Sequence, residues 1–82
     1  MSDTTREQRI HNLDVTLWVG KRGIDAVTEE LNDQLDTQEF VKIKFHRAAR
    51  AGADTEELTA ELADRTNAAV VETRGHTAVI ER

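Results

Sequence analysis

The sequence predicts a two-layer α/β (α+β) fold, a four-stranded mixed sheet packed by helices in the order (α)βαβαββ. Three observations predict it. Two segments alternate apolar and polar residues, two others carry apolar residues at helical spacing, and two strand-like segments flank a glycine turn near the C-terminus. At 82 residues the chain can build one core, so we expect one domain over residues 1–82, with residues 1–5 frayed.

The first half of the chain predicts a short leading helix, a strand and a longer helix. Residues 6–13 are expected to form the leading helix, on the basis of Ile10 and Leu13. Alternation along Asp14–Val19 predicts a strand that ends at Gly20. Its buried face would hold Val15, Leu17 and Val19, and its other face Thr16 and Trp18. The longer helix spans 24–35, where the apolar stripe at helical spacing is Ile24, Val27, Leu31 and Leu35.

The second half predicts a strand, a helix and a terminal hairpin. Residues 40–46 alternate again, with Val41, Ile43 and Phe45 opposite Lys42, Lys44 and His46. Asp54 or Thr55 can cap a helix that runs to about Thr66, because a side-chain oxygen there accepts a free backbone N–H. Strands 69–73 and 77–81 join at Arg74-Gly75-His76, a hairpin signal. Strands linked through helices favour parallel pairing, whereas the hairpin is antiparallel, so the sheet is expected to be mixed.

The composition excludes several classes of protein. Without Cys there is no disulfide framework, thiolate metal site or Cys nucleophile. No apolar run approaches the roughly 18 residues of a membrane span, and the polar start lacks the apolar segment of a signal peptide. We therefore expect a cytoplasmic protein with no membrane partner. Seven Asp and nine Glu against eight Arg and three Lys is typical of chains kept soluble in brine, although any small acidic protein can share this balance.

The net charge of −5 would by itself argue against a nucleic-acid partner, but the charges are partitioned along the chain. Residues 24–39 hold six acids and no base, and residues 54–64 hold five acids and no base. Residues 40–53 hold four bases and no acid. The acids fall on predicted helix surfaces and the bases on a strand and loops, which indicates surfaces of opposite sign.

The segment Gly20-Lys21-Arg22-Gly23 joins the first strand to the first long helix. Two glycines let the backbone approach a ligand closely, the helix start offers free N–H groups, and Lys21 and Arg22 can reach phosphates. The spacing is similar to the GXXG clamp of RNA-binding domains, whereas the spacing of a Walker loop is absent. An ordinary tight turn is the alternative interpretation.

A basic strip is predicted along the second strand and the loop after it. All three lysines of the chain lie in this strand or in the glycine loop, which favours a phosphate-contacting surface over an ordinary solvated sheet face. The strip consists of Lys42, Lys44, Arg47 and Arg50, with His46 on the same strand face. Arg74 and His76 at the hairpin can extend it, or can be ordinary exposed turn residues.

Trp18, the only Trp, is predicted on the strand face opposite Leu17 and Val19. A lone Trp most often packs beneath a neighbouring element, so we expect it to lie under the leading helix of residues 6–13. Its alternative role is to stack on a nucleic-acid base.

No catalytic constellation is evident in the sequence. His11, His46 and His76 lack a metal-ligand spacing such as HExxH. The acids fall on solvated helix faces, and the one Ser, Ser2, lies at the terminus. Because no set of nucleophile, base and orienting group can be proposed, we expect a protein that is not an enzyme and uses no metal or cofactor.

Four motifs resemble, in register, those of the YhbY-like family, whose CRM domain is named for chloroplast RNA splicing and ribosome maturation. Residues 17–24 (LWVGKRGI) resemble its opening L-V-G-K-x-G-(L/I), and residues 39–45 (EFVKIKF) resemble its basic second strand. Residues 57–71 resemble its ELA-x-x-T-x-A-x-(L/V)-V segment, and residues 75–82 its terminal G-x-x-x-(V/L)-(L/I)-Y-R. The similarity covers residues 6–82.

This resemblance implies an RNA-binding domain with the predicted element order and a fold similar to the C-terminal domain of translation initiation factor 3. Bacterial members of the family associate with precursors of the large ribosomal subunit, and plant members act in group II intron splicing. The glycine loop, here residues 20–23, is the family's proposed RNA contact. Glu81 stands where the family often has Tyr, and the acidic helices dilute the family's usual basicity.

We therefore predict a monomeric, non-enzymatic protein that contacts structured RNA, such as ribosomal RNA or its precursors in large-subunit maturation. The predicted RNA contacts are Gly20, Lys21, Arg22, Gly23, Lys42, Lys44, Arg47, Arg50, Arg74 and His76. Two alternatives remain. One is an Alba-like dimeric chromatin protein that binds nucleic acid, and the other is a protein-interaction module that uses the acidic helices.

Overall fold

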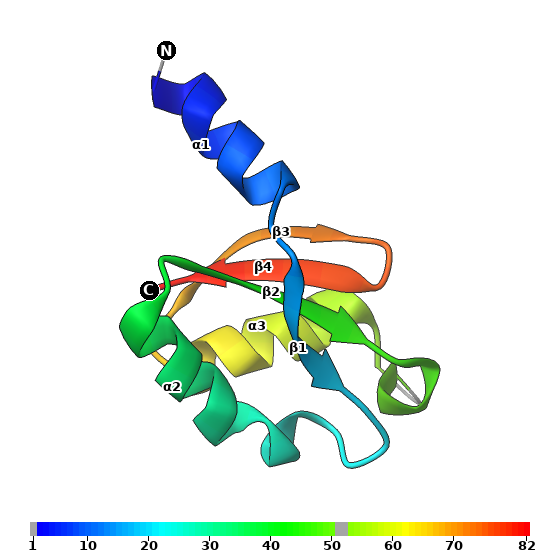
Figure 1. The fold of residues 1–82 in the computed structure, drawn as a ribbon. Coiled ribbons are helices and arrows are strands. Elements are labelled where there is room, and N and C mark those ends of the chain that lie inside the picture. Colours follow the sequence, from blue (N-terminus) through cyan, green and yellow to red (C-terminus); the bar gives the residue numbers. More distant parts are fainter. Residues whose placement is uncertain (1, 51–52) are drawn as a thin grey trace.

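A computed structural model describes residues 2–50 and 53–82, with side chains described from Arg6 onward except that of Arg50. Its helices are α1 (Ser2–His11), α2 (Thr28–Thr37) and α3 (Thr55–Arg65). Its strands are β1 (Val15–Val19), β2 (Phe40–Phe45), β3 (Ala69–Arg74) and β4 (Thr77–Glu81). Two short 3-10 helices, η1 (Ile24–Ala26) and η2 (Arg47–Arg50), follow β1 and β2. The predicted element order and the mixed four-stranded sheet are confirmed (Figure 1).

The sheet has the strand order β1-β2-β4-β3, with β1 and β2 parallel and the other pairs antiparallel. The two parallel strands therefore finish at the same end of the sheet, and the turn between β3 and β4 lies at that end too (right-hand side of Figure 1). Two backbone hydrogen bonds join the three connections. The N–H of His46 donates to the carbonyl of Val19 at 2.9 Å, and the N–H of Phe45 donates to the carbonyl of His76 at 2.8 Å. We call this end, where the three connections meet, the loop end of the sheet.

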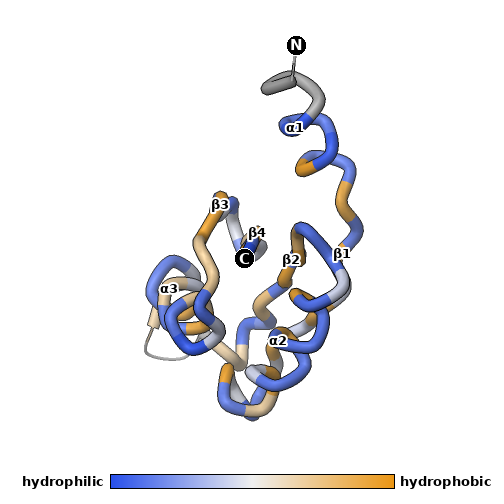
Figure 2. Tube along the Cα trace, turned by 90° about the vertical axis from the view of Figure 1, so that its left-hand side faces the viewer, coloured by the Kyte–Doolittle hydropathy of each residue, from blue (hydrophilic) through white to orange (hydrophobic). Residues whose placement is uncertain are grey.

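The main core lies between the sheet and helices α2 and α3, which cover one sheet face. The predicted apolar stripe of residues 24–35 is buried there, together with Leu62 and Ala63 of α3. The strands contribute Leu17, Val19, Val41, Ile43, Phe45, Ala78 and Ile80. Figure 2 shows hydrophobic and hydrophilic residues alternating along both helices, as expected where each has one buried side. We call the opposite side of the sheet the open face.

Helix α1 packs on the open face at the edge remote from the loop end and projects beyond the sheet (Figure 1). Ile10 is buried against Phe40 and Val79, with Leu13 and Val71 beside them. The guanidinium of Arg6 donates to both carboxylate oxygens of Glu81 at 3.1 Å. The guanidinium groups of Arg6 and Arg9 lie 5.1 and 5.5 Å from the centroid of the Phe40 ring, in the range of cation–π contacts. The Glu81 carboxylate thus holds α1 against the sheet.

Strand β1 departs from the predicted alternation. Its pairing with β2 shifts between Val15 and Leu17, so Val15 lies opposite Lys42 whereas Leu17 lies opposite the buried Ile43. The prediction that Val15 shares the face of Leu17 and Val19 is therefore wrong. The intervening Thr16 is held by α2: its hydroxyl donates to the Gln34 side chain at 2.7 Å, and the Gln34 amide donates to its carbonyl at 3.0 Å.

The helix predicted over 24–35 is divided. The three-residue η1 is followed by Val27, whose φ of −114° and ψ of 0° separate it from α2, which starts at Thr28. The hydroxyl of Thr28 donates to the carbonyl of Ile24 at 2.9 Å across this break. Both arrangements bury the same apolar residues, and their spacing therefore could not distinguish them.

Asp54 caps α3 as predicted, because its side-chain oxygen accepts the N–H of Glu57 at 2.8 Å. We expect Asp54→Ala to lower the free energy of unfolding by about 1 kcal/mol, since that N–H loses its partner. Asp64→Ala, near the other end of the helix, removes a carboxylate that makes no cap and is the matched control. Urea unfolding followed by circular dichroism measures both. Equal loss in the two variants would contradict the capping role.

Candidate nucleic-acid interface

Residues 20–23 form a tight turn in which the N–H of Gly23 donates to the carbonyl of Gly20 at 2.9 Å. Lys21 and Arg22 occupy its two central positions and are exposed. Gly23 has φ 78° and ψ −170°, a conformation essentially restricted to glycine. At Gly20 φ is not positive, and an added Cβ would meet no atom within 4 Å. The fold therefore requires glycine at position 23 but not at position 20.

The prediction that a long helix begins directly after this turn, and offers its free N–H groups to an anion there, is wrong. The turn leads into the three-residue η1, and α2 begins five residues beyond Gly23, with Glu29 and Glu30 in its first turn. Acidic residues at a helix start already use the positive end of its dipole. The positive charge at residues 20–23 therefore comes from the exposed side chains of Lys21 and Arg22.

One row of side chains crosses the open face at the loop end. Trp18 of β1 lies opposite Lys44 of β2, Lys44 lies opposite Thr77 of β4, and Thr77 lies opposite Arg74 of β3. Directly opposite residues share a sheet face, so one residue from each strand forms this row. We call it the loop-end row. It brings the predicted contacts Lys44 and Arg74 onto one surface.

Trp18 is 52% exposed, so the prediction that it packs beneath the leading helix is wrong. Helix α1 instead covers Phe40 and Val79 at the opposite edge of the open face. The sequence located Trp18 on the correct face, but it could not show where along that face α1 would lie.

The remaining predicted residues divide by position. Arg47 is exposed in η2, directly after β2, and the backbone of Arg50 ends the same 3-10 helix, although its side chain is outside the described part. Lys42 lies away from the loop end and is half-buried, and its Nζ donates to the carbonyl of Leu13 at 3.5 Å. Lys42 thus holds the connection between α1 and β1.

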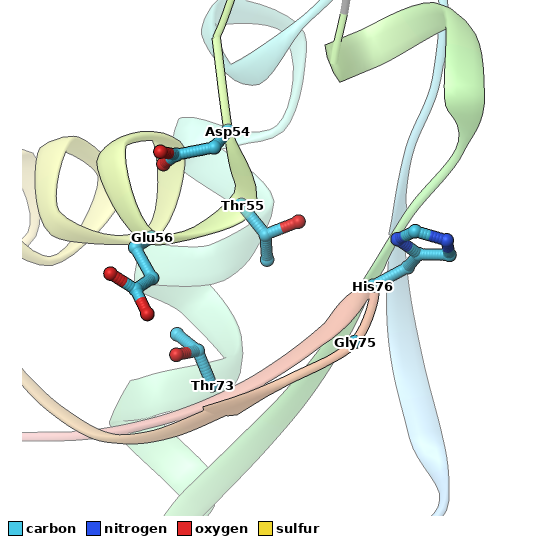
Figure 3. Close-up of a pocket in the computed structure, with 6 residues that line it drawn as sticks. All are labelled: Asp54, Thr55, Glu56, Thr73, Gly75 and His76. Carbon is cyan, nitrogen blue, oxygen red and sulfur yellow. The ribbon is translucent and has the colours of Figure 1, made fainter.

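His76, in the hairpin turn, borders a hollow of about 420 Å³. The hollow is lined by Asp54, Thr55, Glu56, Thr73, Gly75 and His76. Its two carboxylates make it unsuited to a phosphate. Figure 3 shows the His76 imidazole pointing away from the carboxylates of Asp54 and Glu56, so the ring is directed out of the hollow.

Apart from Lys42, which donates to the carbonyl of Leu13, the described Lys and Arg side chains fall into two groups. The first group forms ion pairs: Arg6 with Glu81, Arg9 with Glu39, Arg65 with both Asp25 and Glu61, and Arg82 with Asp36. Hydrogen bonds to Asp25 and Glu61 also raise the pKa of Arg65. Among the side chains that the structure describes, the second group has no carboxylate within ion-pair distance. It consists of Lys21, Arg22, Lys44, Arg47 and Arg74, all at the loop end.

Within the described residues, no three His, Asp or Glu side chains gather in a group that could hold a metal ion. Nor does any helix in that part of the chain have the length and apolar character needed to span a membrane.

Comparisons with known proteins identify the family of this chain. The model of the CRS1/YhbY (CRM) domain matches residues 4–82. A Methanocaldococcus jannaschii protein named a probable RNA-binding protein is 34% identical over 74 residues, covering 90% of this chain and 55% of that protein. The chain thus spans about half the length of that curated relative.

A solved structure shares the fold. A hypothetical protein of Staphylococcus aureus, described as a candidate RNA-binding protein in its solution structure, has a TM-score of 0.75 and 27% identity to this chain. The match covers 93% of this chain and 78% of that one. With the family match extending over residues 4–82, the chain belongs to the CRS1/YhbY (CRM) domain family.

Proposed function

We propose that this protein binds RNA through the loop end of its sheet. The observation that carries the proposal is the division of the basic side chains. Elsewhere in the described chain the Arg side chains have carboxylate partners and Lys42 donates to the carbonyl of Leu13, whereas Lys21, Arg22, Lys44, Arg47 and Arg74 have no carboxylate partner. Unpaired Lys and Arg gain free energy from phosphates because their binding releases counterions from the nucleic acid.

RNA is favoured over other polyanions by two further observations. The family match covers residues 4–82, and both similar proteins are described in terms of RNA binding. We further propose that the target is structured RNA, namely ribosomal RNA or its precursors during maturation of the large subunit. In this role the protein acts in the cytoplasm, as one monomeric CRM-like domain, by binding rather than catalysis.

The proposed contacts have different tasks. Lys21 and Arg22 reach phosphates from the turn, and Gly20 lets the RNA backbone approach because a Cβ there would project into open space. Lys42 is at most a marginal contact, since its Nζ is bonded to Leu13. The other contacts are Gly23, Lys44, Arg47, Arg50, Arg74 and His76. The acidic surfaces of α2 and α3 lie on the other side of the sheet, away from the RNA.

Substitution of both Lys21 and Arg22 by Ala should weaken RNA binding without unfolding the domain. Loss of two phosphate contacts should reduce the slope of log K against log salt concentration by roughly 1.4 to 1.8. Titration of a labelled ribosomal RNA fragment at several KCl concentrations measures this, and circular dichroism checks the fold.

The matched control is Arg9→Ala with Arg65→Ala, which changes the net charge equally but removes cations that already have carboxylate partners. Its RNA affinity should stay near that of the parent protein. If both double variants weaken RNA binding equally, the loss of affinity follows from net charge and not from contacts of Lys21 and Arg22. Unchanged binding after loss of Lys21 and Arg22 would favour the protein-interaction module instead.

The two glycines of the turn should respond differently to alanine. Gly23→Ala should lower the free energy of unfolding by about 1–3 kcal/mol, because its backbone conformation excludes a Cβ. Gly20→Ala should leave stability within about 0.5 kcal/mol and still weaken RNA binding. Urea unfolding and RNA titration of both variants test this. If Gly20→Ala binds RNA as tightly as the parent protein, the proposed close approach of the RNA backbone at Gly20 is contradicted.

The proposal also predicts a particle of about 9.2 kDa in solution. Size-exclusion chromatography with light scattering measures the mass, and crosslinking in the native cells followed by sequencing identifies the bound RNA. Ribosomal precursor reads are expected. A stable dimer that prefers duplex DNA would instead support the Alba-like alternative.

A further inference from the structure

We infer that the loop-end row holds an unpaired RNA base stacked on the indole of Trp18, an inference that rests on the proposed function. The chain has three aromatic side chains. Phe40 and Phe45 are 4% and 1% exposed, whereas Trp18 is 52% exposed. A single exposed apolar side chain is ordinary on a protein surface, so the inference depends on what surrounds this one.

The surroundings of Trp18 suit a nucleotide. Lys44 lies on the adjacent strand, about 4.8 Å away across the ladder, and Arg74 ends the same row. Neither cation has a carboxylate partner among the described side chains. An aromatic face supports base stacking whatever the base, and neighbouring cations bind its phosphates. The row carries no acid that would repel them.

The row is also continuous with the proposed phosphate site. Trp18 precedes Gly20 by two residues, a separation of roughly 7 Å along a strand. RNA held by Lys21 and Arg22 would therefore have its next nucleotide within reach of the indole. Inside a duplex the faces of each base are covered by its neighbours and cannot stack on an indole, so the occupant must come from a loop, bulge or end.

The neighbouring part of the open face limits the site to this row. The next row consists of Val15, Lys42, Val79 and Glu72. The carboxylate of Glu72 disfavours a phosphate there, and Lys42 is bonded to Leu13. Beyond it, α1 packs on Phe40. The proposed path for the RNA therefore runs along the loop end from the turn at residues 20–23, rather than up the sheet toward α1.

Trp18 is the only Trp, so the intrinsic fluorescence of the intact protein reports on this site directly. The probes are an RNA hairpin with an unpaired loop and a blunt RNA duplex of equal length. Binding of each is measured separately by mobility shift. We expect saturable quenching of Trp18 emission by the hairpin loop, and binding with little quenching by the duplex.

Variants supply the energetic test. Trp18→Ala should weaken hairpin binding roughly tenfold while changing duplex binding less than twofold, and Trp18→Phe should restore most of the loss. Val70→Ala is the matched control, because Val70 is also an exposed apolar strand residue, at 42%, but lies opposite the buried Ile80 and outside the row. It should bind both RNAs like the parent protein.

The outcomes separate the two proposals. If both RNAs bind but Trp18 emission and the affinity of Trp18→Ala stay unchanged, base stacking is overturned and binding by the loop end stands. A Trp18→Phe variant as weak as Trp18→Ala would also overturn stacking. If neither RNA binds the parent protein, the proposed function fails, and the inference fails with it.

Discussion

The parallel pairing of β1 with β2 is the constraint on which the rest of the structure depends. It obliges the chain to cross over through η1 and α2, which bury one sheet face. It also makes both strands end at the same edge, where the N–H of His46 bonds to the carbonyl of Val19. Because β4 is antiparallel to β2, the hairpin turn joins them there. Three connections distant in sequence thus form one surface.

That convergence explains how an acidic chain can present a basic surface. Helices α2 and α3 carry eight of the sixteen acids, and acids of several elements pair with arginines brought close by the fold. The cations of the loop end project from connections and from the part of the open face that α1 leaves uncovered. Net charge describes the whole molecule, whereas binding depends on the local potential at one edge.

Much of the fold was predictable because its signals are local. Alternation located β2, the glycine turn at Arg74-Gly75-His76 located the hairpin, and the Asp54 cap located the start of α3. Three features were not predictable because they depend on tertiary contacts. The shift in β1 accompanies the bonds between Thr16 and Gln34, the break before α2 leaves the same residues buried, and the exposure of Trp18 depends on where α1 packs.

In the candidate site, too, local features could be predicted from the sequence whereas tertiary contacts could not. The sequence identified Lys21, Arg22, Lys44 and Arg74 as basic residues near predicted strand ends. It could not show which arginines would find carboxylates, because those partners are far away in sequence: Arg82 bonds to Asp36 of α2 at 2.7 Å, and Arg6 reaches Glu81. The bond from Lys42 to Leu13 likewise became visible only once the connection after α1 was placed.

The acidic helix layer has a consequence for any complex that the loop end forms. When the loop end contacts RNA, the acidic helices α2 and α3 would face solvent. Their surface is negatively charged, as RNA is. A second RNA strand would be repelled from that surface, so one copy could not bridge two strands by charge alone. Each copy would then bind one RNA segment without crosslinking it to neighbouring RNA.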